Sequence, residues 1–259
     1  MLSHLERLLA PDDIQEAWAL HCTRMAGFGF DRLLYGFDRF RNAQGFGALD
    51  DTLILSNHSA DYLETFLRSG MFADAPMVKW AAQSVGARSW RAVAQSYATG
   101  GLNPAERRVL AFNLAHGVSA GVSIAFPDTS SRAKGAIGLC ARPGLSQDDV
   151  DAIWAEHGRE IWVLNSVLHL KISAMPFSTT RRALTSRQRE VLEWVGDGKT
   201  IADIATIMGL TVATVEKHMR LAREALEAEA TAQAVLKATM QKRIFLSAPQ
   251  TLPQSAAKS

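Results

Sequence analysis

The sequence predicts an α+β protein in two parts, an antiparallel sheet with helices on its faces followed by an all-α region. Helix-like and strand-like patterns alternate over the first 172 residues, whereas residues 184–240 are almost purely helical. The charge balance changes with the pattern, because residues 1–172 hold 16 Lys and Arg against 18 Asp and Glu, and residues 173–259 hold 12 against 8. A length of 259 residues also fits two modest domains.

The elements of the first part follow from apolar spacing and capping signals. Asn103, Pro104 and Glu106 are typical of a capped helix start with a capping box. Apolar side chains at helical intervals or in β-rich runs predict the rest. Helices are expected over residues 13–28, 60–68, 75–83, 103–115 and 146–171, and strands over residues 32–40, 52–56, 118–126 and 135–141.

Two segments lack any periodicity. Residues 173–183 are small and polar and include Pro176, which indicates a linker. Residues 244–259 contain prolines and serines but few apolar side chains, which indicates a flexible tail. The predicted domains are therefore residues 1–172 and 184–243.

The second part begins with three helices that have clear start signals. Thr185 and Gln188 form the ends of a capping box, and Thr200 caps a second helix after a Gly-rich turn. Thr211 caps a third helix directly after a tight turn at Gly209 and Leu210. Two short helices, a tight turn and a polar third helix are the plan of a helix-turn-helix.

The third helix carries a charged face opposite its apolar one, formed by Glu216, Lys217, Arg220 and Arg223. A capped helix start presents free N–H groups to phosphate, and a basic face can enter the major groove of DNA. The same pattern is also typical of the solvated face of a helical bundle. Periodicity alone leaves both interpretations open.

Several short motifs follow one another in register through this part, among them Leu184-Thr185, Glu190-Val191-Leu192, Gly198-Lys199-Thr200, Thr214-Val215 and His218. Residues 184–237 thereby resemble the LuxR-type DNA-binding domain, a tetrahelical helix-turn-helix. The resemblance implies that double-stranded DNA is the partner. It implies phosphate contacts by Lys199, Thr200 and Thr211, and a groove face formed by Val212, Ala213, Thr214, Glu216, Lys217 and Arg220, with Arg223 on the same charged side.

A second set of residues is found upstream, in the order Ala75-Pro76, Trp90 and Gly121. This order is similar to that of the autoinducer-binding domain of quorum-sensing LuxR regulators, which residues 8–172 resemble. That domain is an α-β-α sandwich with a closed pocket. Tyr62 and Phe66 stand where the family has a Trp and a Tyr.

The resemblance implies a small-molecule site whose candidate lining residues are Tyr62, Phe66, Phe72, Asp74, Trp80, Trp90, Ser123 and Cys140. In the family, an Asp carboxylate binds the ligand amide, but Ala75 occupies that position here and Asp74 stands one residue early. Because a buried amide without its acceptor costs about 1–3 kcal/mol, a standard acyl-homoserine lactone is disfavoured. We expect a small molecule with fewer amide-like groups or with an aromatic ring.

An alternative to this pocket remains open, because the aromatic residues are also typical of an ordinary core. If they fill the interior, the first domain is a closed dimerisation or protein-interaction module, and the regulator is independent of any ligand.

The predicted helix over residues 146–171 is apolar on more than one side, because Trp154, Trp162 and Val163 widen its apolar stripe. In the family that it resembles, this helix contributes to a homodimer. Burial within one chain would produce the same pattern. A homodimer would read a near-palindromic operator through two half-sites.

Other classes of protein are not favoured. The chain has no nucleophile elbow, phosphate-binding Gly loop, metal-ligand spacing or pair of catalytic carboxylates, so we expect no enzyme and no cofactor. It has no signal-peptide pattern and no apolar run of about 18 residues, so we expect no membrane association. Cys22 and Cys140 have no CxxC partners, which fits a reduced, cytoplasmic location.

Overall fold

A computed structural model describes residues 1–39, 49, 52–127, 130, 132–176 and 183–245. The chain forms two compact units, Met1–Met175 and Pro176–Ser259. Most of the predicted linker and of the predicted tail lies outside the described residues. Two corrections apply at their edges. The helix before the linker continues to Ala174, and Ile244, assigned to the tail, is buried in the core of the second unit.

The first unit is built on a five-stranded antiparallel sheet with the strand order β2-β1-β5-β4-β3. Its register aligns Leu34 on β1 with Gly138 on β5, and Gly138 with Ser123 on β4. These three residues therefore lie side by side across the middle of the sheet. The strands are β1 (Phe30–Asp38), β2 (Thr52–Ser56), β3 (Gly86–Ser89), β4 (Gly121–Ala125) and β5 (Lys134–Ala141).

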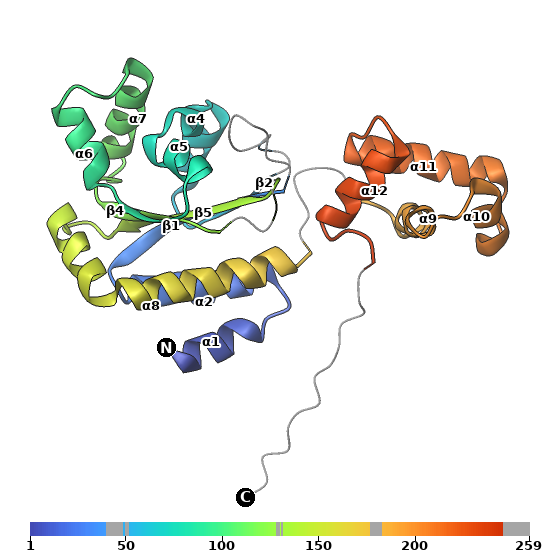
Figure 1. The fold of residues 1–259 in the computed structure, drawn as a ribbon, viewed down its shortest axis with the longest axis horizontal. Helices are drawn as coiled ribbons and strands as arrows, with labels where there is room; N and C mark the ends of the chain where they lie inside the picture. The colour runs from blue at the N-terminus through green and yellow to red at the C-terminus, as the bar shows by residue number, and fades with distance from the viewer. Residues whose placement is uncertain (40–48, 50–51, 128–129, 131, 177–182, 246–259) are drawn as a thin grey trace, which may run out of the picture. The chain divides into compact units, whose positions relative to one another are not determined.

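Helices cover both faces of this sheet, which confirms the predicted α-β-α layers (Figure 1). One face is covered by α2 (Ile14–Ala26) and α8 (Gln147–Ala174), and α1 (Leu2–Leu9) packs against these two helices. The other is covered by α3 (Ala60–Leu63), the π-helix η2 (Glu64–Arg68), α4 (Met71–Asp74), α5 (Pro76–Gln83), α6 (Arg91–Ala98) and α7 (Pro104–Ala115). The predicted capping box at Asn103 and Glu106 is present at the start of α7.

The layer between the sheet and α8 is tightly packed. The hydroxyl of Tyr35 lies 2.8 Å from Nδ1 of His169, and the His169 ring stacks on Phe126 with 4.3 Å between ring centroids. A Cβ atom on Gly135 would lie 2.4 Å from the His169 ring, so only glycine fits there. This face of the sheet is therefore closed by its own side chains.

Sequence patterns missed four short elements, α1, α4, α6 and β3. β3 has only four residues, and both Ala87 and Arg88 are exposed, so it has no apolar alternation to detect. The helix predicted over residues 60–68 is divided into an α-helical and a π-helical turn. The strand predicted from residue 118 begins at Gly121.

The second unit contains α9 (Ser186–Gly196), α10 (Ile201–Met208), α11 (Val212–Leu226) and α12 (Thr231–Met240). Thr185, Thr200 and Thr211 cap the first three helices, as predicted. Gly209 ends α10 in the left-handed conformation at φ 64°, which a glycine adopts without a Cβ clash and which makes the tight turn into α11.

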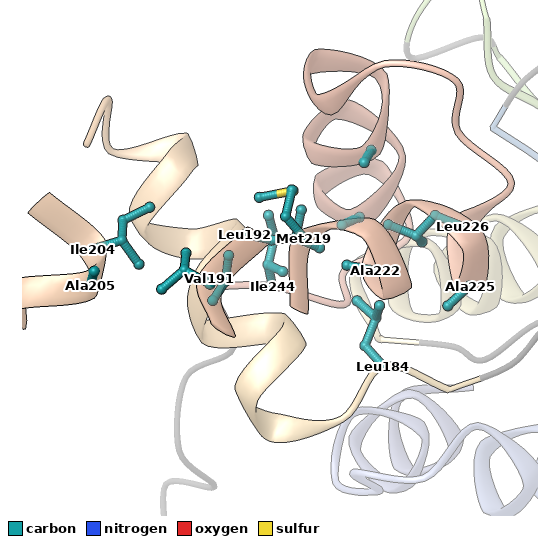
Figure 2. Close-up of a cluster of buried hydrophobic side chains, with 13 residues drawn as sticks. Leu184, Val191, Leu192, Ile204, Ala205, Met219, Ala222, Ala225, Leu226 and Ile244 are labelled. Carbon is teal, nitrogen blue, oxygen red and sulfur yellow. The ribbon is translucent and has the colours of Figure 1, made fainter. Parts of the chain in front are cut away.

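All four helices of this unit contribute to one core (Figure 2). Val191 and Leu192 come from α9, Ile204 from α10, and Met219 and Ala222 from α11. Ala234 and Ala238 of α12 complete it. The tetrahelical fold is therefore confirmed, and the core leaves the opposite face of α11 uncovered within its own unit.

Candidate functional site

A cavity of about 620 Å³ lies in the first unit, between the sheet and the helices α3 to α7. Its floor includes Leu34, Gly138 and Ser123, which the register of the sheet brings together. Its helical wall is mainly apolar, and α3, η2, α5, α6 and α7 all contribute to it. The cavity therefore has the size and character of a site for a small, largely apolar molecule.

Five of the eight candidate pocket residues line this cavity. They are Tyr62, Phe66, Phe72, Trp90 and Ser123. They come from four different elements and a loop position, and their sequence separation reaches 61 residues between Tyr62 and Ser123. The order of motifs along the chain therefore predicted residues that line one cavity, and their contact with a ligand stays a prediction.

The other three candidates do not line the cavity. Asp74 ends α4 and its carboxylate lies 3.4 Å from Nζ of Lys79. Trp80 lies under the guanidinium of Arg88, at 6.0 Å from the ring centroid. Cys140 is buried in the core beside Tyr62, where burial raises the pKa of its thiol to about 11.

Trp90 is held flat against the sheet by two glycines. A Cβ atom on Gly121 would lie 2.9 Å from the Trp90 ring and 2.3 Å from the Leu139 carbonyl oxygen, and one on Gly138 would lie 3.8 Å from the ring. The indole N–H donates to Oγ of Ser123 at 2.9 Å. The hydroxyl proton of Ser123 has no acceptor within the described part of the chain, so this group can donate to a ligand.

Tyr62 forms the second polar group of the cavity. Its ring stacks with those of His58, Phe66 and Phe112, at 4.7 to 5.4 Å between centroids. Its hydroxyl donates to Oδ1 of Asn113 at 3.0 Å, and burial raises the pKa of the phenol. Because three rings already stack on Tyr62, it contributes a hydroxyl more readily than an aromatic face.

Sequence reasoning missed several polar lining residues, among them His58 and Asn113. Burial lowers the pKa of His58 to about 4, so its imidazole is neutral at pH 7. His58 stands before Ser59, which caps α3, so no helical periodicity connects it to Tyr62 in the sequence. Asn113 lies on a partly exposed helix, and no sequence signal distinguishes it from a surface residue.

The exposed face of α11 carries most of the predicted groove residues. Thr214 is half-buried and its hydroxyl lies 2.8 Å from that of Thr211. Val215 and Met219 are buried on the opposite side. The exposed members are Thr211, Val212, Ala213, Glu216, Lys217 and Arg220.

Two residues that are predicted to contact DNA make hydrogen bonds within the chain. Arg223 is half-buried and donates to the carbonyl oxygen of Glu229 at 3.4 Å. Thr200 is exposed, but its hydroxyl donates to Asp203 at 2.7 Å, and this bond lowers the pKa of the Asp203 carboxyl. The Asp203 carboxylate therefore already occupies the start of α10, and the exposed cation beside it is Lys199.

Other kinds of site have no candidate within the described ranges. Among the helices that can be described, none has the length and apolar character needed to cross a membrane. The described residues hold no group of three or more His, Cys, Asp or Glu side chains arranged to bind a metal ion. Both cysteines are free thiols.

The two units thus define a class of protein that combines a small-molecule cavity with a helix-turn-helix. The family model of the autoinducer-binding domain matches residues 13–172, and that of sigma-70 region 4 matches residues 181–226. The chain belongs to the autoinducer-binding-domain family, within its LuxR type.

Curated relatives match shorter segments. The transcriptional activator protein AnoR of Acinetobacter nosocomialis is 32% identical over 90 residues, which is 33% of this chain and 37% of AnoR. SolR of Ralstonia nicotianae, also a transcriptional activator protein, is 45% identical over 56 residues, 22% of this chain and 24% of SolR. The matched segments therefore span well under half of these relatives.

Two solved structures share the fold. SdiA in complex with octanoyl-rac-glycerol has a TM-score of 0.53 and 16% identity, and the match covers 92% of this chain and 93% of that one. The transcription factor CepR2 from Burkholderia cenocepacia has a TM-score of 0.50 and 18% identity, with 66% and 94% covered. At these identities the likeness concerns the fold alone.

Proposed function

We propose that this chain is a transcriptional regulator that binds duplex DNA through α11. The observation that carries this proposal is the exposed face of α11, which presents Lys217 and Arg220 opposite the buried Val215 and Met219. A capped helix after a tight turn is the element that a helix-turn-helix inserts into the major groove. The relatives named as transcriptional activator proteins support the same role.

The proposed contacts with DNA are of two kinds: contacts to phosphates, which position the chain on the duplex, and contacts to base edges, which recognise the sequence. Lys199 and the start of α11 at Thr211 are suited to phosphate, because they offer a cation and free backbone N–H groups. Thr200 contributes to phosphate binding only if its bond to Asp203 opens. The exposed residues of α11 are suited to base edges.

Selection from randomised duplexes tests this role, followed by affinity measurements on the full chain at several salt concentrations. We expect an enriched sequence, and a logarithm of affinity that falls linearly with the logarithm of salt. Absence of any enriched duplex, with no binding at low salt, would overturn the proposal.

We further propose that the cavity of the first unit binds a small molecule. Its volume of about 620 Å³ and mainly apolar lining favour a ligand site over a closed interaction module. The fold is that of SdiA, which has been solved with octanoyl-rac-glycerol. Such a ligand can regulate DNA binding only by binding one conformation of the chain better than another.

The ligand we propose differs from a standard acyl-homoserine lactone. The methyl group of Ala75 lines the cavity, while the Asp74 carboxylate pairs with Lys79. An amide N–H therefore lacks a carboxylate acceptor among the described lining residues, whereas Ser123 can donate to a carbonyl. We expect a neutral acyl or aromatic compound whose polar atoms are mainly acceptors.

A matched pair of ligands tests this preference. N-octanoyl-homoserine lactone and its ester analogue differ only in that oxygen replaces the amide N–H. We expect the ester to raise the melting temperature of the full chain more than the amide does. Equal or greater stabilisation by the amide would contradict the preference. No shift with either compound, nor with octanoyl-glycerol or aromatic acids, would favour the closed module.

We also propose a homodimer that reads a near-palindromic operator. On α8, Leu170 is 59% exposed, and Trp154 and Trp162 are only half-buried within one chain, which supports a further packing partner. Two α11 helices per assembly would add their modest affinities. Light scattering over a range of concentrations tests this, with twice the chain mass expected and a persistent single-chain mass contradicting it. Acting on DNA, the regulator would be located in the cytoplasm.

A further inference from the structure

The exposed face of α11 contains an acidic residue in the middle of a surface that would meet DNA. Glu216 lies four residues after Val212 and four before Arg220, so the three form one row along the helix. Within the described part of the chain, its carboxylate makes no ion pair or hydrogen bond. Arg220 is paired instead with Glu224, at 2.6 Å. The carboxylate of Glu216 is therefore available to a partner outside the chain.

A carboxylate on such a surface is unfavourable towards DNA in general. It repels the phosphates, and this lowers the affinity for every sequence alike. Only a base that donates a hydrogen bond to it offsets the loss. In the major groove these donors are the N4 amino group of cytosine and the N6 amino group of adenine.

Cytosine suits Glu216 better than adenine does. The adenine N6 amino group lies beside N7, an acceptor that repels a carboxylate, whereas an amide side chain satisfies both atoms. The rest of the row fits the same groove, because Val212 is 47% exposed and its methyl groups can contact a thymine methyl. About half of the Val212 surface is therefore available to a partner outside the chain.

We propose that Glu216 is a specificity-determining residue that selects cytosine at one position of each DNA half-site. This inference rests on the proposed binding of DNA by α11. It goes beyond that proposal by assigning a base to one side chain. The carboxylate lowers the affinity for DNA unless cytosine donates a hydrogen bond to it. Duplexes with another base at that position are therefore bound more weakly.

Exchange of Glu216 for glutamine tests the assignment directly. The full chain and its Glu216→Gln variant are each used to select duplexes from a randomised library, and affinities are measured for the selected site with all four bases at each position. For the wild-type chain we expect one cytosine per half-site whose replacement weakens binding about tenfold or more. In the variant the preference at that position changes to adenine, because an amide both accepts from N6 and donates to N7.

The control is Glu229→Gln, which removes the same charge from the same unit at an exposed residue whose carboxylate makes no ion pair or hydrogen bond within the described part of the chain. It should raise the affinity for all sequences and leave the base preference unchanged. An unchanged preference at every position in Glu216→Gln overturns the assignment, as does a change at a position that is not cytosine. If the wild-type chain selects no sequence at all, the proposed DNA binding itself is overturned, and the two failures are thus distinguishable.

Discussion

The indole nitrogen of Trp90 lies 2.9 Å from Oγ of Ser123, and this bond connects the helical wall of the cavity to its sheet floor. Trp90 is the residue before α6, and Ser123 is the central residue of β4. The bond fixes the ring over Gly121 and Gly138 and leaves the Ser123 hydroxyl proton free to donate into the cavity. The Ser123 hydroxyl is therefore a donor that the floor of the pocket presents to a ligand.

Ser123→Ala should therefore change both stability and ligand binding. It leaves the part-buried Trp90 N–H without its acceptor, and we expect this to lower the free energy of unfolding by about 1 kcal/mol. Trp90→Phe combined with Ser123→Ala removes both partners, so the effects of the two changes should not add. Urea unfolding of the single and double variants checks this, and strict additivity would show that the bond is unimportant.

Gly121→Ala should destabilise the first unit by about 1–3 kcal/mol, because the added Cβ meets the backbone oxygen of Leu139 as well as Trp90. Gly138→Ala is the matched control under the same ring. There the added Cβ finds ordinary contact distances of 3.8 Å to Trp90 and 3.9 Å to the Leu34 oxygen. We expect almost no loss in the control, and equal losses in both variants would contradict the packing described for Trp90.

Acidification should destabilise the first unit through its buried histidines. Burial lowers the pKa of His21 and of His169 from 6.5 to about 4. Between these values the unfolded chain binds more protons than the folded one, so the free energy of unfolding falls as the pH is lowered from about 6.5 to 4. Each histidine contributes about 1.4 kcal/mol per pH unit.

Urea unfolding between pH 7 and pH 4.5 measures this dependence, followed by tryptophan fluorescence because five of the six tryptophans belong to this unit. His169→Gln should reduce the slope of the free energy of unfolding against pH by the contribution of one histidine. Parallel pH profiles for the wild-type chain and the His169→Gln variant would refute the assignment.

Glu227→Gly should stabilise the second unit. Glu227 ends α11 in the left-handed conformation, at φ 46° and ψ 53°, which costs a residue with a Cβ atom about 1 kcal/mol relative to glycine. Calorimetry of the full chain should show a second unit that melts a few degrees higher. Glu227→Ala keeps the Cβ atom and should not show this gain, and an equal gain in both variants would assign the effect to removal of the charge instead.

Local signals in the sequence predicted the helix-turn-helix well. The capping residues Thr185, Thr200 and Thr211 and the turn at Gly209 each act within one helical turn, so their effect can be recognised without the rest of the fold. Short elements such as β3 were missed, because four residues at a sheet edge show no periodicity and take their shape from pairing with β4.

The cavity was predicted only in part, since it is assembled from distant segments. Aromatic residues such as Tyr62 and Trp90 stand out in a sequence, and both line it. Asp74 was included because it stands one residue before the position of the family's Asp, but it pairs with Lys79 instead. Asn113 was overlooked, because only the packing of α7 against α3 brings it to the Tyr62 hydroxyl.

The most direct test of the DNA-binding surface is a salt titration of duplex-DNA affinity with the Lys217→Ala, Arg220→Ala double variant. Arg68→Ala is the control, because Arg68 has an i,i+4 partner in Glu64 as Arg220 has in Glu224, and it belongs to the first unit. We predict weaker binding by the double variant at every salt concentration. Its log–log slope should be shallower by about 1 for each phosphate that the variant no longer neutralises, with the control unchanged. Affinity and slope equal to those of the wild-type chain would contradict the account.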